Sequence, residues 1–351
     1  MLGGPACWPA FATTGQALRF PRDFGSHPDQ RIEWWYVTGA LRSGSRRFGF
    51  QVTFFRSRVE GAQGLKSAFA ARQLIFAHAA LTDVQGQRLW RAQRVAREGF
   101  GWAQASESDT GIRLGDWRLT RIDGKPSGPY DAELQADDFG LQLRFTPRQS
   151  LLLHGPDGIS QKGPDARQSS HYYSEPQLQV TGHLRLKQEH FELDRTDHEG
   201  WNRAWLDHEW SQELMAPQAV GWDWLGINLL DGGALMAFRM RRPDGSTLWS
   251  ACTWRSSEGK TLTASNGQIR WTPLRHWESP QSQARYPVEW ALSCLAGEFR
   301  VRALVDAQEL DSRQSTGAIY WEGLCELLDT AQQLVGRGYL EMTGYAEAIH
   351  L

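Results

Sequence analysis

Short runs of alternating hydrophobic and polar residues, separated by turn dipeptides, extend along the whole chain. Clear examples are "RIEWWYVTGAL" (31–41), "RFGFQVTFFRSR" (47–58), "RQLIFAHAALTD" (72–83) and "LQLRFTPRQ" (141–149). Alternation with a period of two is typical of β-strands with one buried face. Asp-Gly and Asn-Gly pairs recur between such runs, as at 231–232 and 266–267, and favour tight hairpin turns. The pattern predicts an all-β protein of antiparallel barrels or sandwiches rather than βαβ units.

One passage, 322–342, carries both a helical and a hairpin signal. Its sequence, "EGLCELLDTAQQLVGRGYLEM", is rich in Leu, Glu and Gln, which have good helix propensity. Two apolar flanks around a polar middle also fit a β-hairpin. Of the two, we favour the hairpin.

The chain is expected to divide into two domains. A length of 351 residues is too great for one ordinary core and suits two domains of typical size. The charged connection "KQEHFELDRTDHEG" follows the strand-like run that ends at residue 186. We therefore predict an N-terminal domain over residues 1–190 and a C-terminal domain over residues 191–351.

Composition and charge narrow the classes of partner. Hydrophobic residues make up 40% of the chain and charged residues 22%, as in ordinary globular proteins. The formal charge of −2 gives no electrostatic case for binding nucleic acid. No apolar run approaches the roughly 20 residues that span a bilayer, so no transmembrane segment is expected. The abundance of aromatic residues, among them 17 tryptophans, agrees with β-structure.

The heptapeptide "WLDHEWS", which begins at Trp205, sets two carboxylates and an imidazole between tryptophans. Charged side chains are costly to bury unless they are paired. Strand alternation places Trp205, Asp207 and Glu209 on one face, and His208 and Trp210 on the other. The three adjacent ionisable residues therefore cannot share one cavity unless a β-bulge intervenes.

Two chemical interpretations stand for Asp207, His208 and Glu209 as catalytic residues. If Asp207 and Glu209 face a cavity, the pKa of one rises, and that group donates a proton near neutral pH. If His208 and Trp210 face it, the imidazole acts as acid or base and the indole stabilises a cation. Ion pairing and core packing explain the same residues without any function. A metal site is disfavoured, because adjacent strand residues diverge and no HExxH motif is present.

Aromatic and polar residues on other strand-like segments are candidates for a ligand-binding wall beside Trp205 and Trp210. Trp222 and Trp224 share one face of "GWDWLGINLL", which suits a flat apolar ligand, although core packing explains them equally well. The further candidates, drawn from several segments along the chain, are Glu33, Trp35, Tyr36, His78, Tyr172, Tyr173, Tyr320 and Glu322. The chain has no GxSxG, P-loop or GxGxxG motif, and we expect no cofactor.

Several of these segments together resemble the AttH/carotenoid 1,2-hydratase (hydroxyneurosporene synthase) family. They are "HPDQRIEWWYVTGAL", "FAHAAL", "HYYSEP", "WLDHEWS", "GWDWLGINLLDGGALMAFRMR" and "YWEG…GYLEMTGY", in order from about residue 27 to residue 345. The resemblance implies two lipocalin-like antiparallel β-barrel domains packed side by side. It also implies an apolar ligand, since barrels of this type hold apolar ligands in their mouths.

The resemblance implies a function only in outline. Some family members add water to a carotenoid end group, and many bacterial members are described as predicted secreted hydrolases whose genes accompany an ABC exporter. The pigment enzymes carry a tyrosine and an aspartate on the strand where this chain has Phe238, Arg239 and Met240. That departure favours the AttH-like exported branch, with Arg239 as a further ligand-binding candidate.

Two hypotheses of different classes follow. In the first, the protein binds a hydrophobic small molecule, a lipid or polyene, and acts on it by acid-catalysed hydration, hydrolysis or isomerisation. In the second, it is a non-catalytic periplasmic carrier that serves an ABC exporter. Both imply a periplasmic or secreted location with the export signal already removed, because the start, "MLGGPACWPAFATTG", lacks the features of a signal peptide.

Overall fold

The computed structural model describes residues 17–349 except 123–124, 126–127, 196–198 and 214. Outside the strands, the described residues contain three short 3-10 turns, η1 (Arg22–Phe24), η2 (Glu60–Ala62) and η3 (Pro156–Gly158). The expected all-β class is therefore confirmed. None of the described helical turns has the length or apolar character to cross a membrane. The predicted periplasmic or secreted location depends on residues 1–15, which lie outside the described residues, and it stays a prediction.

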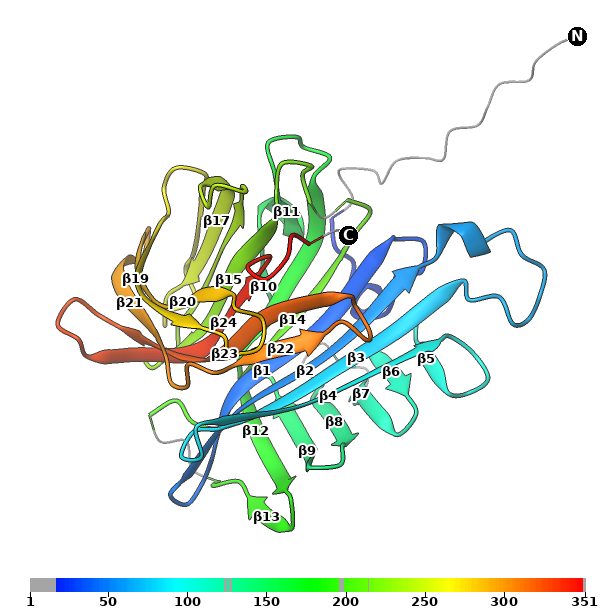
Figure 1. The fold of residues 1–351 in the computed structure, drawn as a ribbon, viewed down its shortest axis with the longest axis horizontal. Helices are drawn as coiled ribbons and strands as arrows, with labels where there is room; N and C mark the ends of the chain where they lie inside the picture. The colour runs from blue at the N-terminus through cyan, green and yellow to red at the C-terminus, as the bar shows by residue number, and fades with distance from the viewer. Residues whose placement is uncertain (1–16, 123–124, 126–127, 196–198, 214, 350–351) are drawn as a thin grey trace, which may run out of the picture.

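The first sheet contains fourteen strands and follows the order β4-β3-β2-β1-β14-β12-β9-β8-β7-β6-β5, with β10, β11 and β13 paired to β12. Its long strands are β1 (Ile32–Ser43), β2 (Arg46–Arg58), β3 (Gln73–Asp83), β4 (Arg88–Arg97), β12 (Ser169–Leu186) and β14 (Arg203–Ser211). The shorter ones are β5 (Ala103–Ala105), β6 (Gly111–Leu114), β7 (Trp117–Arg121), β8 (Tyr130–Gln135), β9 (Phe139–Thr146), β10 (Leu152–Leu153), β11 (Ile159–Gln161) and β13 (Glu189–Glu192). Strands β3 and β4 at one edge contact β5 and β6 at the other, so the sheet forms a nearly closed barrel (Figure 1).

The second sheet contains ten strands in the order β18-β17-β16-β15-β24-β23-β21-β20-β19, with β22 paired to β23. They are β15 (Gly221–Leu229), β16 (Ala234–Arg241), β17 (Thr247–Arg255), β18 (Thr261–Ser265), β19 (Arg270–Glu278), β20 (Arg285–Cys294), β21 (Gly297–Ala303), β22 (Glu309–Ser312), β23 (Ala318–Leu328) and β24 (Leu334–Thr343). Every strand pairing in the described part of this sheet is antiparallel, and the sheet forms a half-barrel. The two lipocalin-like barrels implied by the resemblance are therefore present.

Segment 322–342 forms the β23–β24 hairpin, so the hairpin prediction is confirmed over the helix. The predicted division between residues 190 and 191 stays a prediction as a domain boundary. The hydrogen-bonded sheets change over later, between Ser211 and Gly221, because β14 pairs with both β1 and β12 and completes the first sheet.

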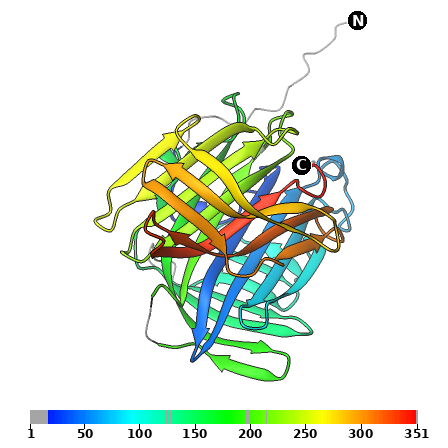
Figure 2. The same ribbon diagram turned by 60° about the vertical axis from the view of Figure 1, so that its left-hand side comes forward.

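The two sheets pack against each other through the outer face of the first barrel (Figure 1, Figure 2). Strands β1, β14 and β15 are therefore buried on both faces. On β14, Leu206 packs into the first barrel and Trp205 packs between the sheets. On β15, Leu225 packs into the second barrel and Trp224 packs between the sheets. The outer faces of β14 and β15 would be exposed to water in separate barrels. Here they face each other between the two sheets.

Candidate functional site

A pocket of about 580 Å³ lies between the two sheets. Its size is within the range of small-molecule sites. Exposed residues, among them Arg31, Thr316 and Glu347, border its solvent side. Its walls carry aromatic and acidic side chains from both barrels, principally Trp34, Tyr36, Phe55, Phe76, His78, Lys162, Tyr172, Asp207, Glu209, Trp222, Trp224, Phe238, Met240, Tyr320, Glu322 and Glu341.

Strand register explains why Asp207 and Glu209 face the pocket. On β14 these residues stand opposite Tyr36 and Trp34 of β1, respectively. The pairing runs without a bulge through this stretch, so side chains alternate strictly between the two faces. The structure thus brings two of the three predicted catalytic residues to the pocket and sends His208 into the first barrel.

Asp207 is buried and surrounded by hydrogen-bond donors. Its carboxylate accepts bonds from Trp205 Nε1 at 2.6 Å, from the Tyr172 hydroxyl at 2.9 Å and from the Ser174 hydroxyl. Burial raises the pKa of Asp207 to about 7, although these three donors act in the opposite direction. The group is therefore near its titration point at neutral pH, but its oxygens already have partners within the protein.

Glu209 forms a buried ion pair. Lys162 Nζ lies 2.8 Å from Glu209 Oε1, and the Ser170 hydroxyl donates to the same oxygen at 2.5 Å. The ammonium group also lies 4.2 Å from the ring centre of Phe238 and 4.6 Å from that of Tyr172. Glu209 is thus held as a paired carboxylate, and Lys162 places one positive charge in the pocket wall.

Two tryptophans of β15 form the wall contributed by the second barrel. Trp224 Nε1 donates to the Tyr172 hydroxyl at 2.9 Å, and Trp222 Nε1 donates to Glu341 Oε1 at 3.2 Å. The rings of Trp224 and Trp205 meet edge to face, with centres 6.3 Å apart. Gly226 permits this contact, because a Cβ atom there would lie 2.3 Å from the Trp224 ring and 3.2 Å from the Trp205 ring.

Glu322 and Glu341, which we name the carboxyl pair, stand directly opposite each other on β23 and β24 and both line the pocket. Burial and the charge of Glu341 raise the pKa of Glu322 well above its ordinary value. Burial, together with the charges of Asp207 and Glu209, raises that of Glu341. Two close carboxyl groups in an apolar site do not both ionise readily, so this pair retains a proton at neutral pH.

His78 and Ser315 also reach the pocket, where they join the two barrels. Gln93 Nε2 donates to the Asp311 carbonyl at 3.0 Å, which orients its Oε1 to accept from the Ser315 hydroxyl at 2.5 Å. His78 Nε2 then donates to Ser315 Oγ at 2.8 Å, and Nδ1 accepts from the Tyr320 hydroxyl at 2.5 Å. Burial lowers the pKa of His78 to about 4, in keeping with a neutral ring. In this tautomer the imidazole cannot act as a base for Ser315. We therefore interpret His78, Ser315, Tyr320 and Gln93, which we name the latch, as a hydrogen-bonded contact between the two barrels rather than as a nucleophile and its base.

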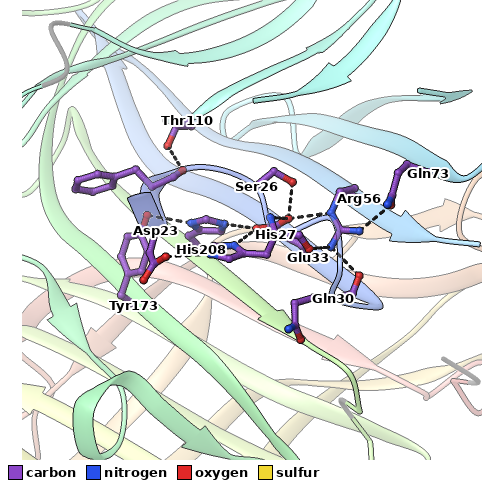
Figure 3. Close-up of polar contacts among 11 residues, drawn as sticks. Asp23, Ser26, His27, Gln30, Glu33, Arg56, Gln73, Thr110, Tyr173 and His208 are labelled. Atoms are coloured by element: carbon purple, nitrogen blue, oxygen red, sulfur yellow. Dashed lines mark hydrogen bonds and ion pairs between the residues drawn. The ribbon is translucent and has the colours of Figure 1, made fainter. Parts of the chain in front are cut away.

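A second polar cluster occupies the opposite face of β14 and β1 (Figure 3). We name it the Glu33 cluster, and it consists of Asp23, Ser26, His27, Glu33, Arg56, Tyr173 and His208. Glu33 is fully buried, and its Oε1 accepts from His27 Nδ1 at 2.8 Å and His208 Nε2 at 2.9 Å. Its Oε2 accepts from Arg56 Nε at 2.9 Å and Ser26 Oγ at 2.8 Å. Both oxygens of this carboxylate are therefore saturated.

Charges in the Glu33 cluster balance. Burial disfavours ionised Glu33, but hydrogen bonds from His208 and His27 outweigh it and hold the pKa of Glu33 well below its usual range. Burial likewise opposes charge on His27, but Asp23 and Glu33 together raise its pKa. Burial lowers the pKa of His208 to about 4, so its neutral ring donates to Glu33 and accepts from Tyr173 at 3.0 Å.

Three atoms of this cluster have the spacing of a metal site. One ligand atom each from His27, Glu33 and His208 lies within 4.8 Å of the others. Their hydrogen bonds already satisfy these atoms, and the Arg56 guanidinium beside Glu33 repels a second cation. We therefore assign the cluster to hydrogen bonding and place no metal in it.

The predicted ligand-binding residues divide between the two faces. Those that line the pocket are Tyr36, His78, Tyr172, Trp222, Trp224, Tyr320 and Glu322. Those that lie in or against the Glu33 cluster, because strand alternation turns them inward, are Glu33, Trp35, Tyr173 and Trp210. Trp205 packs between the sheets behind Asp207. Arg239 lies away from the pocket and pairs with Asp223 at 2.7 Å, on the face of β16 opposite to Phe238.

Several pocket residues were not singled out from the sequence. Lys162, Phe238 and Met240 gave no signal, because only the packing of one barrel on the other brings them to the pocket. Glu341 had a signal, since a hairpin over 322–342 sets its two ends side by side.

Comparison with known proteins agrees with this fold. The family model described as AttH-like matches residues 11–345. A candidate AttH protein from Nitrosomonas europaea is 43% identical, with a TM-score of 0.86, and the match covers 96% of this chain and 99% of that one. No curated protein matches the chain.

More distant structures share the fold alone. Kievitone hydratase from Nectria haematococca is 14% identical with a TM-score of 0.72, and the match covers 94% of each chain. The structure of CghA is 12% identical with a TM-score of 0.53, and the match covers 92% of this chain and 90% of that one. The two-barrel architecture therefore persists where little sequence identity remains.

Proposed function

This chain belongs to the AttH-like family, and from that premise we propose that its pocket binds a hydrophobic small molecule, a lipid or polyene, and protonates it. The reaction classes open to such a site are hydration, hydrolysis and isomerisation by acid catalysis. The observation that carries the proposal is the juxtaposition of aromatic rings and buried, uncompensated carboxyl groups in one pocket of about 580 Å³.

The wall chemistry supports an apolar ligand. Indole and phenol rings from both barrels, chiefly Trp34, Tyr36, Trp222 and Trp224, offer large flat surfaces with few polar atoms. The same rings stabilise positive charge that develops on a ligand, because the face of an aromatic ring is electronegative. A protonated alkene is such a species.

The acidic residues favour an enzyme over a carrier. Binding an apolar molecule for export needs no ionisable group in the pocket, and burying carboxyl groups costs free energy. Carboxyl groups that remain protonated at neutral pH have a use in proton transfer. That one protein of the same fold is by name a hydratase is in keeping with this direction.

The binding step can be tested with the fluorescent polyene cis-parinaric acid. The chain has 17 tryptophans, several of them in the pocket wall, so bound polyene should quench their emission by energy transfer. We expect saturable quenching that Trp224→Ala weakens strongly. The matched control, Trp277→Ala, alters a tryptophan of β19 that is not among the pocket residues and should leave binding unchanged.

The chemical step can be followed by mass spectrometry in ¹⁸O-labelled water. Squalene, geranylgeraniol and cis-parinaric acid serve as substrates with isolated, allylic and conjugated double bonds. Hydration adds one labelled oxygen, whereas isomerisation changes retention without changing mass. Absence of both saturable binding and conversion for all three probes would contradict the proposed function.

A further inference from the structure

We propose that Glu322 is the proton donor of this pocket and that Glu341, which stands opposite it on the hairpin, is the acidic neighbour that keeps it protonated. The inference rests on the proposed function and assigns its chemistry to the hairpin of the second barrel rather than to "WLDHEWS". It follows from which carboxyl oxygens in the pocket are already bonded and which are free.

The carboxyl pair differs from Asp207 and Glu209 in its partners. Asp207 accepts three hydrogen bonds, and Glu209 is paired with Lys162. Glu322 is only 2% exposed, yet neither of its oxygens has a hydrogen-bond partner of ordinary geometry. A buried polar atom without a partner costs free energy, so its presence in a pocket wall indicates a group that meets a ligand or water.

Tyr36 strengthens the assignment from the other barrel. Its hydroxyl is buried and also lacks a hydrogen-bond partner of ordinary geometry. It lies near enough to Glu322 to favour the charged form of that carboxyl, which Glu341 and burial oppose more strongly. The end of the pocket therefore holds three oxygens, two from Glu322 and one from Tyr36, that have no hydrogen-bond partner of ordinary geometry and can bind a substrate or a water molecule.

The charges around the carboxyl pair maintain its proton. No described arginine or lysine forms an ion pair with Glu322 or Glu341, although ion pairs are abundant elsewhere in the structure. The ionisable groups that influence the pair come from β1, β14, β15, β23 and β24, and they are Tyr36, Asp207, Glu209, Asp223, Tyr320 and Tyr339. All of these groups are acids. Lys162 is bound to Glu209, and that pair adds little net charge.

The step balances with water as the only co-reactant. The π electrons of a substrate double bond take the proton of Glu322, which forms a new C–H bond and leaves the Glu322 carboxylate and a carbocation. Trp222 and Trp224 supply ring faces beside that cation. A water molecule adds to the cation and passes one proton to the carboxylate, which regenerates the acid and gives the alcohol. Loss of a different proton to Glu322 instead gives the isomerised alkene.

The donor assignment is tested first without any substrate. A protonated buried carboxyl group has an infrared carbonyl band that is distinct from carboxylate bands. We expect the wild type to show such absorption at neutral pH, and Glu322→Gln to lose one component of it. The control Glu298→Gln removes an exposed carboxyl on β21 and should leave the band intact. A band unchanged in Glu322→Gln would overturn the assignment.

Turnover separates this inference from the proposed function. We expect Glu322→Gln to bind cis-parinaric acid as the wild type does and to lower conversion of the reactive probe at least about 100-fold, as general-acid removal does. Glu341→Gln should move the pH profile of conversion to lower pH, because the like charge that raises the pKa of Glu322 is gone. Conversion by Glu322→Gln at the wild-type rate overturns the donor role alone. A wild type that binds or converts none of the probes contradicts the proposed function and, with it, the donor role.

Discussion

The two faces of β14 carry polar clusters of opposite character. Inside the first barrel, Glu33 is fully buried with both oxygens bonded to imidazole, hydroxyl and guanidinium groups. Across the pocket from the outer face, Glu322 is almost as buried and has no hydrogen-bond partner of ordinary geometry. Burial removes both carboxyl groups from water, which costs free energy. Only Glu33 offsets that cost with hydrogen bonds and an ion pair inside the protein. The contrast indicates that saturation of hydrogen bonds, rather than burial or charge, separates a structural cluster from a reactive one.

The largest expected difference between the clusters concerns folding. Glu33→Gln leaves the buried Arg56 without its anion and takes one of two carboxylates from His27, and removing one partner of a buried ion pair costs about 3 kcal/mol or more. Glu322→Gln removes no hydrogen bond of ordinary geometry and should not destabilise the fold at neutral pH. Denaturant unfolding followed by tryptophan fluorescence measures both.

The two substitutions are matched, since each replaces one buried glutamate by its isosteric amide. Equal losses of stability would show that the carboxyl pair is as structural as the Glu33 cluster. That result would remove the basis for distinguishing the two faces.

The next largest difference is in the sign of the pH dependence. A raised folded-state pKa means that the Glu322 contribution is complete below pH about 4.5 and is lost as pH rises through the folded value. Glu33 has a lowered pKa, so its contribution is present above about 4.5 and is lost as pH falls through its folded value. Relative to the wild type, Glu322→Gln should therefore become more stable as the pH rises from 5 to 8, because the amide has no proton to lose.

Unfolding midpoints across this pH range test the prediction. Glu33→Gln serves as the counterpart, because its deficit should shrink only below pH about 4.5. A parallel pH dependence of the wild type and Glu322→Gln would mean that Glu322 has an ordinary pKa in the folded protein.

The sequence predicts much of the fold. It also predicts that the ionisable residues of β14 divide between two faces, but not which face lines the pocket. Turn dipeptides and alternation predict the strands, and alternation alone separates Asp207 and Glu209 from His208. Alternation does not say which face meets a pocket, because both faces of β14 combine apolar or aromatic residues with ionisable ones. Only the docking of the second barrel decides. The sequence does not distinguish Trp210 from Trp222, yet Trp210 packs against the Glu33 cluster and Trp222 lines the pocket.

The carboxyl pair shows where register limits prediction. The pairing of β23 with β24 shifts by one residue between Leu327 and Leu328. A hairpin continued regularly from the Leu328–Leu334 pair would place Glu322 opposite Leu340 and turn Glu341 to the other face. The irregularity instead sets Glu322 opposite Glu341. A single extra residue of this kind has no reliable signature in the sequence.

A smaller effect is expected from paired tryptophan substitutions. Trp222→Phe removes ring area and the donor to Glu341 from the pocket, and should weaken binding of cis-parinaric acid about tenfold, or about 1.4 kcal/mol. Trp210→Phe alters a ring stacked on His27 at 3.8 Å in the Glu33 cluster and should leave affinity unchanged. Fluorescence titration compares them. Weaker binding in Trp210→Phe alone would place the ligand on the wrong face of β14 for our proposal.

The smallest expected effect comes from a substitution in the latch. It tests whether satisfied hydrogen bonds, rather than location at the pocket, mark a structural group. His78 and Ser315 lie at the pocket, as the carboxyl pair does, but their hydrogen bonds are satisfied, as in the Glu33 cluster. If saturation marks structural groups, Ser315→Ala should cost about 1 kcal/mol, the value of a typical hydrogen bond, and should speed amide hydrogen exchange in the β22–β23 loop. Conversion of the reactive probe should persist, because Ser315 then takes no part in the chemistry. Thr316→Ser, a neighbouring change that keeps its hydroxyl, controls for disturbance of the loop. Loss of conversion in Ser315→Ala with binding intact would show that a group with satisfied hydrogen bonds can still react. Hydrogen-bond saturation would then not distinguish the structural face of β14 from the reactive one.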